Sequence, residues 1–452
     1  MTDRRESSAV LALPRREELI IRGAYVLTMD DHLGDIPGAD IHVRDGEIIS
    51  VAKHVDAPSA TVIDAGGLVA MPGFIDTHTH VWTGLMRSLI RDGPPGDYNT
   101  LKAQLGPLFR PPDTYWATLC GAAEALTAGI TSLHNWAHNI RQPDDADASM
   151  RAHTDLGLRG RFSYGSATDT GPASLMDLND LPRIRNAWIA NRGDSLVDLG
   201  MALRGPYLTP ERVYRAEWEA ARDLRLPVTI HYASYRAEVA RIKVLQVLDR
   251  DGLLDVDLQL IHGLYATNDD RALMRSAGAS LSCAPLAVLR NGLGLPSIRE
   301  MLDDHIQVSL SLDTASLAGS LDMFAAMRTL LMVEHGKHEN TELQAREVLR
   351  LATLEGARDL DILDKVGSIT PGKRADLLLL DFRSLNTEPA LTEDGLADIA
   401  TLIVYSCAPQ NVDTVMIDGR LLKRNGRLTS VDIDATIEGG RRTLSSILAR
   451  RT

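Results

Sequence analysis

The 452-residue sequence contains little cysteine. Its three cysteines, Cys120, Cys283 and Cys407, are odd in number and far apart in the chain. This spacing excludes a disulfide framework and the paired cysteines of a structural zinc site. Because disulfides are rare in reducing compartments, the composition predicts a cytoplasmic protein.

Long apolar runs are also absent. No stretch approaches the ~20 apolar residues that a helix needs to cross a membrane. The apolar run 9–13 near the N-terminus is shorter than the roughly 7–15-residue core of a secretory signal. We therefore expect neither a membrane partner nor secretion.

Basic residues are outnumbered by acidic ones. The chain has 48 Lys plus Arg against 61 Asp plus Glu, which gives a formal net charge of −13. A surface of this sign repels phosphate backbones, so we expect a small-molecule substrate rather than nucleic acid. Hydrophobic residues make up 44% of the chain, which excludes a disordered or fibrous protein.

Strand-like and helical runs alternate through the middle of the chain. Eight such units predict a parallel (β/α)8 barrel of TIM type, whose strands are apolar on both faces because both faces are covered. A doubly wound open sheet is the alternative, since polar residues gather at strand C-termini in both folds. The eight strand-like runs are residues 73–78, 129–133, 160–163, 197–204, 226–231, 258–262, 279–283 and 307–312.

Further strand-like runs with turn signals occur at both ends of the chain. Asp45-Gly46 indicates a hairpin between two of them. We predict that residues 1–70 and 368–452 form one discontinuous β-sandwich domain with a C-terminal helix, and that residues 71–367 form the catalytic barrel. The runs are 19–29, 39–43, 47–52, 61–65, 375–381, 399–404, 412–417 and 419–422.

Side chains of the types that bind metals end four of the eight central runs. His78 and His80 lie two residues apart, so both point to the same side of a strand. Protonated imidazoles at this spacing repel each other, which favours a shared cation such as Zn²⁺. His231, His262 and Asp313 end three further runs. Each is singly compatible with a buried core residue or a helix cap, but together they predict one metal site at the barrel mouth.

Longer motifs surround these residues. Over about residues 19–423 the sequence resembles the amidohydrolase superfamily, and more narrowly its triazine hydrolase and cytosine deaminase branch. The resemblance implies a metal-bearing barrel beside a β-sandwich, and it implies that His262 bonds the attacking water or the substrate carbonyl. The implied metal ligands are His78, His80, His231 and Asp313. The motifs are MPGFIDTHTH at 71–80, IH at 230–231 and 261–262, LD at 312–313, and GSITPGKRADLLLLD at 367–381.

The number of metal ions follows from the fourth run. Members of the superfamily with two metals bridge them with a carboxylated lysine on strand four, whereas run 197–204 contains no lysine and ends in Arg204. We therefore predict one divalent ion, Zn²⁺ first, with Fe²⁺, Mn²⁺ or Co²⁺ also compatible with these ligands. Such an ion lowers the pKa of water to about 7. Asp313 and His262 are the expected catalytic residues: Asp313 passes a proton from water to the leaving nitrogen, and His262 polarises the electrophile.

One position departs from the family pattern. Deaminases of this branch carry a glutamate three residues after the strand-five histidine, where this chain has Ser234, and Glu238 is expected to face elsewhere. Because cleavage of an exocyclic amide, urea or carbamate needs no protonated ring nitrogen, we expect a hydrolase of such bonds, nearest in character to the phenylurea and molinate hydrolases. The alternatives are a deaminase of a purine, pterin or triazine, and a catalytically inactive binding subunit.

Several residues near the strand ends are candidates for substrate binding. They are Asn135, Trp136 and His138 after strand two, Arg204 after strand four, and Tyr232 and Tyr235 after strand five. For each, a purely structural role is the alternative: a satisfied polar loop, an ion pair of Arg204 with a barrel acid, or tyrosine packing. Oligomers are frequent among such proteins, and we expect a homo-oligomer.

Overall fold

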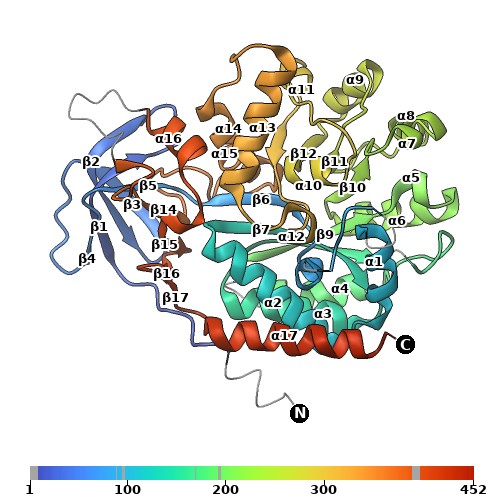
Figure 1. Cartoon of the computed structure of the whole chain (residues 1–452), viewed down its shortest axis with the longest axis horizontal. Helices are drawn as coiled ribbons and strands as arrows, with labels where there is room; N and C mark the ends of the chain where they lie inside the picture. Colours follow the sequence, from blue (N-terminus) through green and yellow to red (C-terminus); the bar gives the residue numbers. More distant parts are fainter. Residues whose placement is uncertain are drawn as a thin grey trace.

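The eight runs at the centre of the chain form a parallel barrel (Figure 1). Within the residues that the structure describes, eight strands pair in chain order and in parallel. This confirms the barrel fold and excludes the open sheet. The strands are β6 (Phe74–Thr79), β7 (Ile130–Ile140), β8 (Arg159–Ser166), β9 (Val197–Leu203), β10 (Val228–Tyr232), β11 (Leu258–His262), β12 (Ser280–Cys283) and β13 (Val308–Leu310).

This computed structural model describes residues 9–87, 89–93, 97–167, 169–191, 195–388 and 398–451. The first eight residues of the predicted discontinuous domain lie outside this set. In the described ranges, no helix has the length and apolar character that a membrane crossing requires.

The barrel closes between its first and last strands. Thr79 forms a parallel bridge with Asp313, and backbone hydrogen bonds run from Asp313 N to His78 O (2.9 Å) and from His80 N to Asp313 O (2.5 Å). The buried Asp76 carboxylate also accepts the backbone N–H of Leu312 at 3.1 Å. Closure therefore places the end of β13 directly beside His78 and His80.

Helices cover the outside of the barrel, mostly one or two between successive strands (Figure 1). Those around the first half are the 3-10 turns η2 (Val81–Met86) and η3 (Gly106–Leu108), α1 (Tyr98–Leu105), α2 (Pro111–Thr127), α3 (Pro143–Leu156), α4 (Asp180–Arg185), the π-helical turn η4 (Asn186–Ala190), α5 (Gly205–Leu208) and α6 (Glu211–Leu224). Those around the second half are α7 (Arg236–Arg241), α8 (Val244–Arg250), α9 (Asn268–Ala277), α10 (Pro285–Arg290), α11 (Arg299–Asp303), α12 (Ala315–Ala318), α13 (Met323–His338), α14 (Ala345–Leu351) and α15 (Leu354–Asp359).

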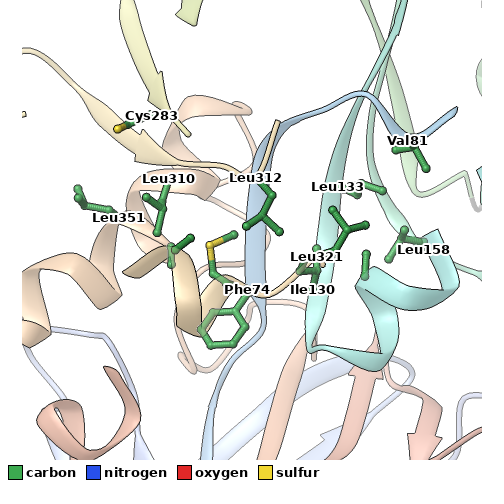
Figure 2. Packing of buried hydrophobic residues seen from close by; sticks show 14 of the residues in the cluster. Phe74, Val81, Ile130, Leu133, Leu158, Cys283, Leu310, Leu312, Leu321 and Leu351 are labelled. Carbon is green, nitrogen blue, oxygen red and sulfur yellow. The ribbon is translucent and has the colours of Figure 1, made fainter. Parts of the chain in front are cut away.

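The main hydrophobic core lies between these strands and helices. Figure 2 shows part of it, where Phe74 at the start of β6 lies near Leu312 and Leu321. The Phe74 ring also meets Phe324 of α13 edge to face, with 4.9 Å between ring centroids. Because both faces of the barrel strands are covered, nearly every residue of β6 and β7 is buried.

A mixed sheet built from both ends of the chain lies beside the barrel (Figure 1). Asp45 and Gly46 both have positive φ (53° and 81°) in its predicted hairpin. In the described part of the chain its order is β17-β16-β15-β14-β5-β1-β2-β3, with β4 paired to β1. The strands are β1 (Leu19–Leu27), β2 (Asp35–Arg44), β3 (Glu47–Ala52), β4 (Thr61–Asp64), β5 (Leu68–Pro72), β14 (Leu377–Asp381), β15 (Val412–Ile417), β16 (Arg420–Arg424) and β17 (Arg427–Leu428).

The last helix, α17 (Ile433–Ala449), lies against the barrel helix α2 (Figure 1). Gly439 allows this close approach, since a Cβ at that position would overlap the Trp116 ring. The C-terminal helix that the sequence predicts is therefore present, and it packs on the barrel.

Two secondary-structure predictions are wrong. Residues 399–404 form a helix, α16 (Ile399–Ser406), because Asp398 caps its N-terminus through Thr401 N and its buried residues have helical spacing. It is followed by the 3-10 turn η6 (Pro409–Asn411). The helical pattern of residues 237–251 predicts one helix, whereas the structure has two there, α7 and α8, separated by extended backbone at Ile242.

A buried ion pair joins the barrel to the mixed sheet. Arg159, which begins β8, donates from Nε to Asp376 Oδ2 (2.6 Å) and from Nη2 to Asp376 Oδ1 (3.1 Å). Both side chains are less than a tenth exposed. Burying such a pair is favourable only while both partners are present.

We expect Arg159→Met to destabilise the fold by about 3–5 kcal/mol, because the substitution leaves the Asp376 carboxylate buried without its partner. Urea unfolding followed by circular dichroism measures this. Arg222→Met is the matched control: its partner Asp255 is 63% exposed, so we expect a loss of less than about 1 kcal/mol. Equal losses in the two variants would contradict the importance of this contact.

Candidate metal and active site

Five side chains meet at the C-terminal mouth of the barrel. His78 lies in β6 and His80 directly follows that strand, His231 comes from β10 and His262 from β11, and Asp313 follows β13. The described residues contain two groups of ligand atoms within 4.8 Å of one another: one joins His78, His231 and His262, the other His78, His80 and Asp313. Asp313 Oδ1 lies 3.4 Å from His80 Nε2 and 3.6 Å from His78 Nε2, and the Nε2 atoms of His80 and His231 are 3.3 Å apart.

The backbone is strained where two of these residues sit. His262 has φ 77° and Asp313 has φ 61°, a region that residues other than glycine rarely adopt. His262 ends β11 and Asp313 comes shortly after β13, so the positive φ turns the chain sharply at the barrel rim. Strain of this kind persists where the surrounding structure fixes it, and it clusters at functional sites.

The polar atoms of the cluster fit a bound cation. The His78 ring is fully buried, and neither of its nitrogens has a hydrogen-bond partner among the described residues. A buried imidazole without partners is costly unless a ligand satisfies it. Three or more imidazoles with one carboxylate are a typical donor set for Zn²⁺ and related ions.

Electrostatics hold the imidazoles in the form that binds metals. Burial lowers the pKa of His80 and of His231 well below the usual value, and neighbouring histidines lower it further. Burial also lowers the pKa of His262 to about 4, against a smaller opposing effect of Asp313. Burial would raise the pKa of Asp313, but the His78 side chain beside it and electrostatic interactions with His262, His78 and Lys102 lower it overall. Neutral imidazoles and an ionised carboxylate are the ligand forms of these groups.

Neighbouring residues orient the cluster. His80 Nδ1 lies 3.1 Å from the carbonyl oxygen of Trp136, which directs its Nε2 toward His231 and Asp313. The Trp136 indole donates to Thr229 Oγ1 at 3.1 Å, and Thr229 Oγ1 donates to Gln259 Oε1 at 2.9 Å. The position of the Trp136 ring beside the histidines is thereby fixed.

A cavity of about 260 Å³ opens above the cluster. Its floor contains His80, His231, His262 and Asp313. Its walls combine aromatic rings with polar groups, the usual lining of a small-molecule site. The lining residues used below are Tyr98, Lys102, Trp136, His138, Arg204, Tyr207, Ser234, Tyr235 and Glu238.

Four of the residues proposed for substrate binding line this cavity: Trp136, His138, Arg204 and Tyr235. Arg204 is constrained, however. Its guanidinium donates to the carbonyl oxygens of Gly171 (2.7 Å) and Ser174, so it is held by loop backbone and not by the barrel acid considered above. Tyr235 is 40% exposed and lies at the cavity rim.

Asn135 and Tyr232 require a correction, because their side chains face away from the cavity. The Asn135 amide donates to Ser149 Oγ at 2.9 Å on α3, and Tyr232 is buried with its hydroxyl bonded to Asp270 on α9. Neighbours along a strand point to opposite faces, so the inward Trp136 and His231 place both residues outward.

Sequence reasoning missed several residues of the cavity, among them Tyr98, Lys102 and Glu238. Tyr98 and Lys102 come from α1, which follows β6 in a connection whose path the sequence does not indicate. Burial lowers the pKa of Lys102, and its ammonium lies over the Tyr98 ring. Glu238, which we expected to face elsewhere, is only 3% exposed and lines the cavity. The only signal for Glu238 was its place one helical turn beyond Ser234.

Comparisons with known proteins agree with this geometry. The model of the amidohydrolase family matches residues 69–422, which confirms the resemblance read from the motifs. A 5-methylthioadenosine/S-adenosylhomocysteine deaminase of Pyrococcus furiosus is 27% identical over 431 residues, covering 93% of this chain and 98% of that protein. A 5′-deoxyadenosine deaminase of Methanosarcina mazei is 27% identical over 444 residues, covering 96% and 99%.

Solved structures share the fold. An adenosine deaminase from Xanthomonas campestris with bound zinc superposes with a TM-score of 0.84 at 24% identity, covering 96% of this chain and 100% of that one. An atrazine chlorohydrolase from Arthrobacter aurescens complexed with zinc gives 0.82 at 22% identity, covering 95% and 100%. A barrel with a small additional domain is therefore the fold of this chain.

We expect purified protein to hold about one divalent ion per chain, and His231→Ala to reduce that content to a trace, because one neutral imidazole ligand is lost. Elemental analysis of the gel-filtered protein measures the metal content per chain. The control is His54→Ala, since the His54 side chain is 78% exposed. Full occupancy in His231→Ala would remove His231 from the ligand set, and two ions per chain would contradict the single-ion prediction.

Proposed function

Because this chain belongs to the amidohydrolase family, we propose that it is an aminohydrolase that removes the amino group of an adenine nucleoside derivative. As a member of this family it is a metal-dependent hydrolase of carbon–nitrogen bonds. Of the two enzymatic readings that the sequence left open, deamination has more support than cleavage of an amide, urea or carbamate.

One observation carries the proposal. The relatives that match nearly the whole chain are named as deaminases of 5-methylthioadenosine, S-adenosylhomocysteine or 5′-deoxyadenosine. These substrates share an adenine ring and differ in the group at the 5′ position of the ribose. We therefore assign the adenine ring to the part of the cavity next to the cluster, and leave the 5′ group open.

The cavity supports a flat heterocyclic substrate. Trp136, Tyr98 and Tyr207 contribute aromatic surface to its walls, which suits contact with a planar ring. Polar side chains, including His138 and Ser234, lie in the same walls and can fix the orientation of ring nitrogens.

The cluster supplies the proposed metal site. We assign His78, His80, His231 and Asp313 as ligands of one divalent ion, with Zn²⁺ favoured by the zinc in related structures. Strand β9 contains no lysine that could bridge a second ion, and the residue that follows it is Arg204. When bound, such an ion supplies Lewis-acid chemistry that makes water a nucleophile near neutral pH.

The protein's own residues perform the proton transfers. Asp313, ionised at neutral pH, accepts a proton from the attacking water and delivers it to the departing amine. His262 Nε2 lies 3.9 Å from Asp313 Oδ2. We assign it to stabilise the negative charge that develops on the substrate as water attacks.

Cleavage of an acyclic urea or amide is the second candidate. It is favoured by Ser234, which stands where deaminases of the branch carry a glutamate. The proposed domains are a catalytic barrel at 71–367 and a β-domain from 1–70 with 368–452. The homo-oligomeric state and the cytoplasmic location stay predictions.

Incubation of the zinc-loaded enzyme with a matched substrate panel tests the proposal. We expect ammonia and a hypoxanthine-type product from adenosine, 5′-deoxyadenosine, 5′-methylthioadenosine or S-adenosylhomocysteine, measured by coupled ammonia assay and ultraviolet absorbance. Amine release from phenylureas, anilides or carbamates without any ammonia from the nucleosides would favour the second candidate. No turnover on either set would favour a binding subunit.

We expect Asp313→Asn to lower kcat by at least about 100-fold, as for a lost acid–base group. Metal content is measured on the same sample, so that a loss of the ion is distinguished from a loss of proton transfer. Asp303→Asn is the control, because Asp303 is 62% exposed on α11. Near-normal turnover in Asp313→Asn would remove Asp313 from the chemistry.

A further inference from the structure

Glu238 is the second carboxylate of the cavity. Among the described residues that line it, the acidic side chains are Asp313 and Glu238. Asp313 lies among the histidines of the proposed metal site. Glu238 forms no ion pair that the structure records, and its hydrogen bonds are to backbone N–H groups. The cavity thus contains one carboxylate at the cluster and one apart from it.

We propose that Glu238 is a catalytic residue that exchanges a proton with the ring nitrogen of the substrate, in the place of the glutamate that Ser234 replaces. This inference rests on the proposed function. It removes the objection that the sequence raised against deamination, since the required carboxyl group comes from one helical turn further along the chain.

The path of the chain brings Glu238 back to the end of β10. Ala233 adopts a left-handed conformation (φ 48°) and reverses the chain directly after the strand. Helix α7 then begins after Tyr235, which places Glu238 in its first turn. There the carboxylate accepts the backbone N–H of Ala233 at 2.8 Å and that of Ser234 at 3.0 Å. Glu238 is therefore fixed beside Ser234, which occupies the position of the deaminase glutamate.

Ser234 cannot fill this role itself. Its hydroxyl is buried, lines the same cavity and has no hydrogen-bond partner in the described part of the chain. A serine hydroxyl is far too weak an acid to protonate a heterocyclic nitrogen near neutral pH, whereas a carboxyl group in a buried site is suited to it. Burial raises the pKa of Glu238, although its backbone hydrogen bonds partly oppose this.

Two carboxyl groups, those of Asp313 and Glu238, account for every proton transfer in the reaction. Water loses a proton to Asp313 as its oxygen bonds to the amino-bearing carbon, and the electron pair of the ring C=N bond moves to nitrogen, which takes the proton of Glu238. The carbon–amine bond then breaks, and the amine leaves as ammonia with the proton of Asp313. The new hydroxyl returns its proton to Glu238 as the C=O bond forms. Both carboxyl groups end as they began.

A structural role alone would also explain the two backbone hydrogen bonds, because a glutamate in the first turn often caps a helix. The test must therefore distinguish a contact with the ring nitrogen from a cap. Glu217 provides the control. It is a buried glutamate on α6, its pKa is raised to about 7 by burial, and it accepts the backbone N–H of Met176 outside the cavity.

Binding of two probes tests the contact without any turnover. The zinc-loaded enzyme and its Glu238→Gln and Glu217→Gln variants are titrated with purine riboside and with 1-deazapurine riboside, which replaces the ring nitrogen by CH. We expect the wild type and Glu217→Gln to prefer purine riboside about tenfold or more, as for one buried hydrogen bond. Because a glutamine amide can itself donate to the ring nitrogen, the same titration is made with Glu238→Met, whose side chain has no donor, and with Glu217→Met as its control. We expect Glu238→Met to lose the preference and Glu217→Met to keep it. Equal affinities in the wild type, or an unchanged preference in Glu238→Met, would overturn the proposal.

Kinetics provide the second part of the test. On the best aminopurine substrate, we expect Glu238→Gln to lower kcat/KM by about 10²–10⁴-fold and to abolish the decline of kcat/KM at high pH that deprotonation of Glu238 causes. Metal content and unfolding midpoint should match the wild type. Rescue by Ser234→Glu in the Glu238→Gln background would support the replacement. If the wild type shows the binding preference but deaminates nothing, the proposed function fails while the Glu238 contact stands.

Discussion

The closure of the barrel between β6 and β13 is the constraint on which the site depends. The paired backbone of His78, His80 and Asp313 carries two hydrogen bonds across that seam, and Asp76 adds a third contact to Leu312. The Asp313 carboxylate lies within 4 Å of both imidazoles because the chain is fixed there. A barrel that stayed open at this seam would leave β13 and its aspartate far from the first strand.

Burial then gives this geometry its chemical character. Histidines this close would repel one another if protonated, and burial keeps His80, His231 and His262 neutral. The same burial leaves His78 without a hydrogen-bond partner within the described ranges. The cluster therefore destabilises the fold when nothing is bound to it, and it suits the binding of a cation. The hydrogen bond of His80 with the Trp136 carbonyl and the buried Thr229–Gln259 contact keep the side chains of the cluster in position.

The alternation of strand residues explains which substrate-binding predictions the structure supports by position. Trp136 and His138 share the inward face of β7, whereas Asn135, the residue before Trp136, faces Ser149 on α3. His231 and Tyr232 divide in the same way at the end of β10. Side chains alternate between the two faces of a strand, so the period of two already separates Asn135 and Tyr232 from the face that carries Trp136 and His231.

The sequence by itself determined eight parallel βα units, since apolar runs covered on both faces require helices between the strands, and it determined the strand ends that carry His78, His80, His231, His262 and Asp313. The backbone contacts between the ends of β6 and β13 decided for the closed barrel over the open sheet. Local patterns sufficed because strand period and strand order are set by nearby residues and by parallel pairing. The tertiary structure alone decided the helix at Ile399–Ser406, where a cap and packing against α13 and α14 override β-branched residues. It also decided the cavity walls. The left-handed turn at Ala233 reverses the chain and brings Glu238 back to the site, and the path of α1 brings Lys102 to residues that are distant in the sequence.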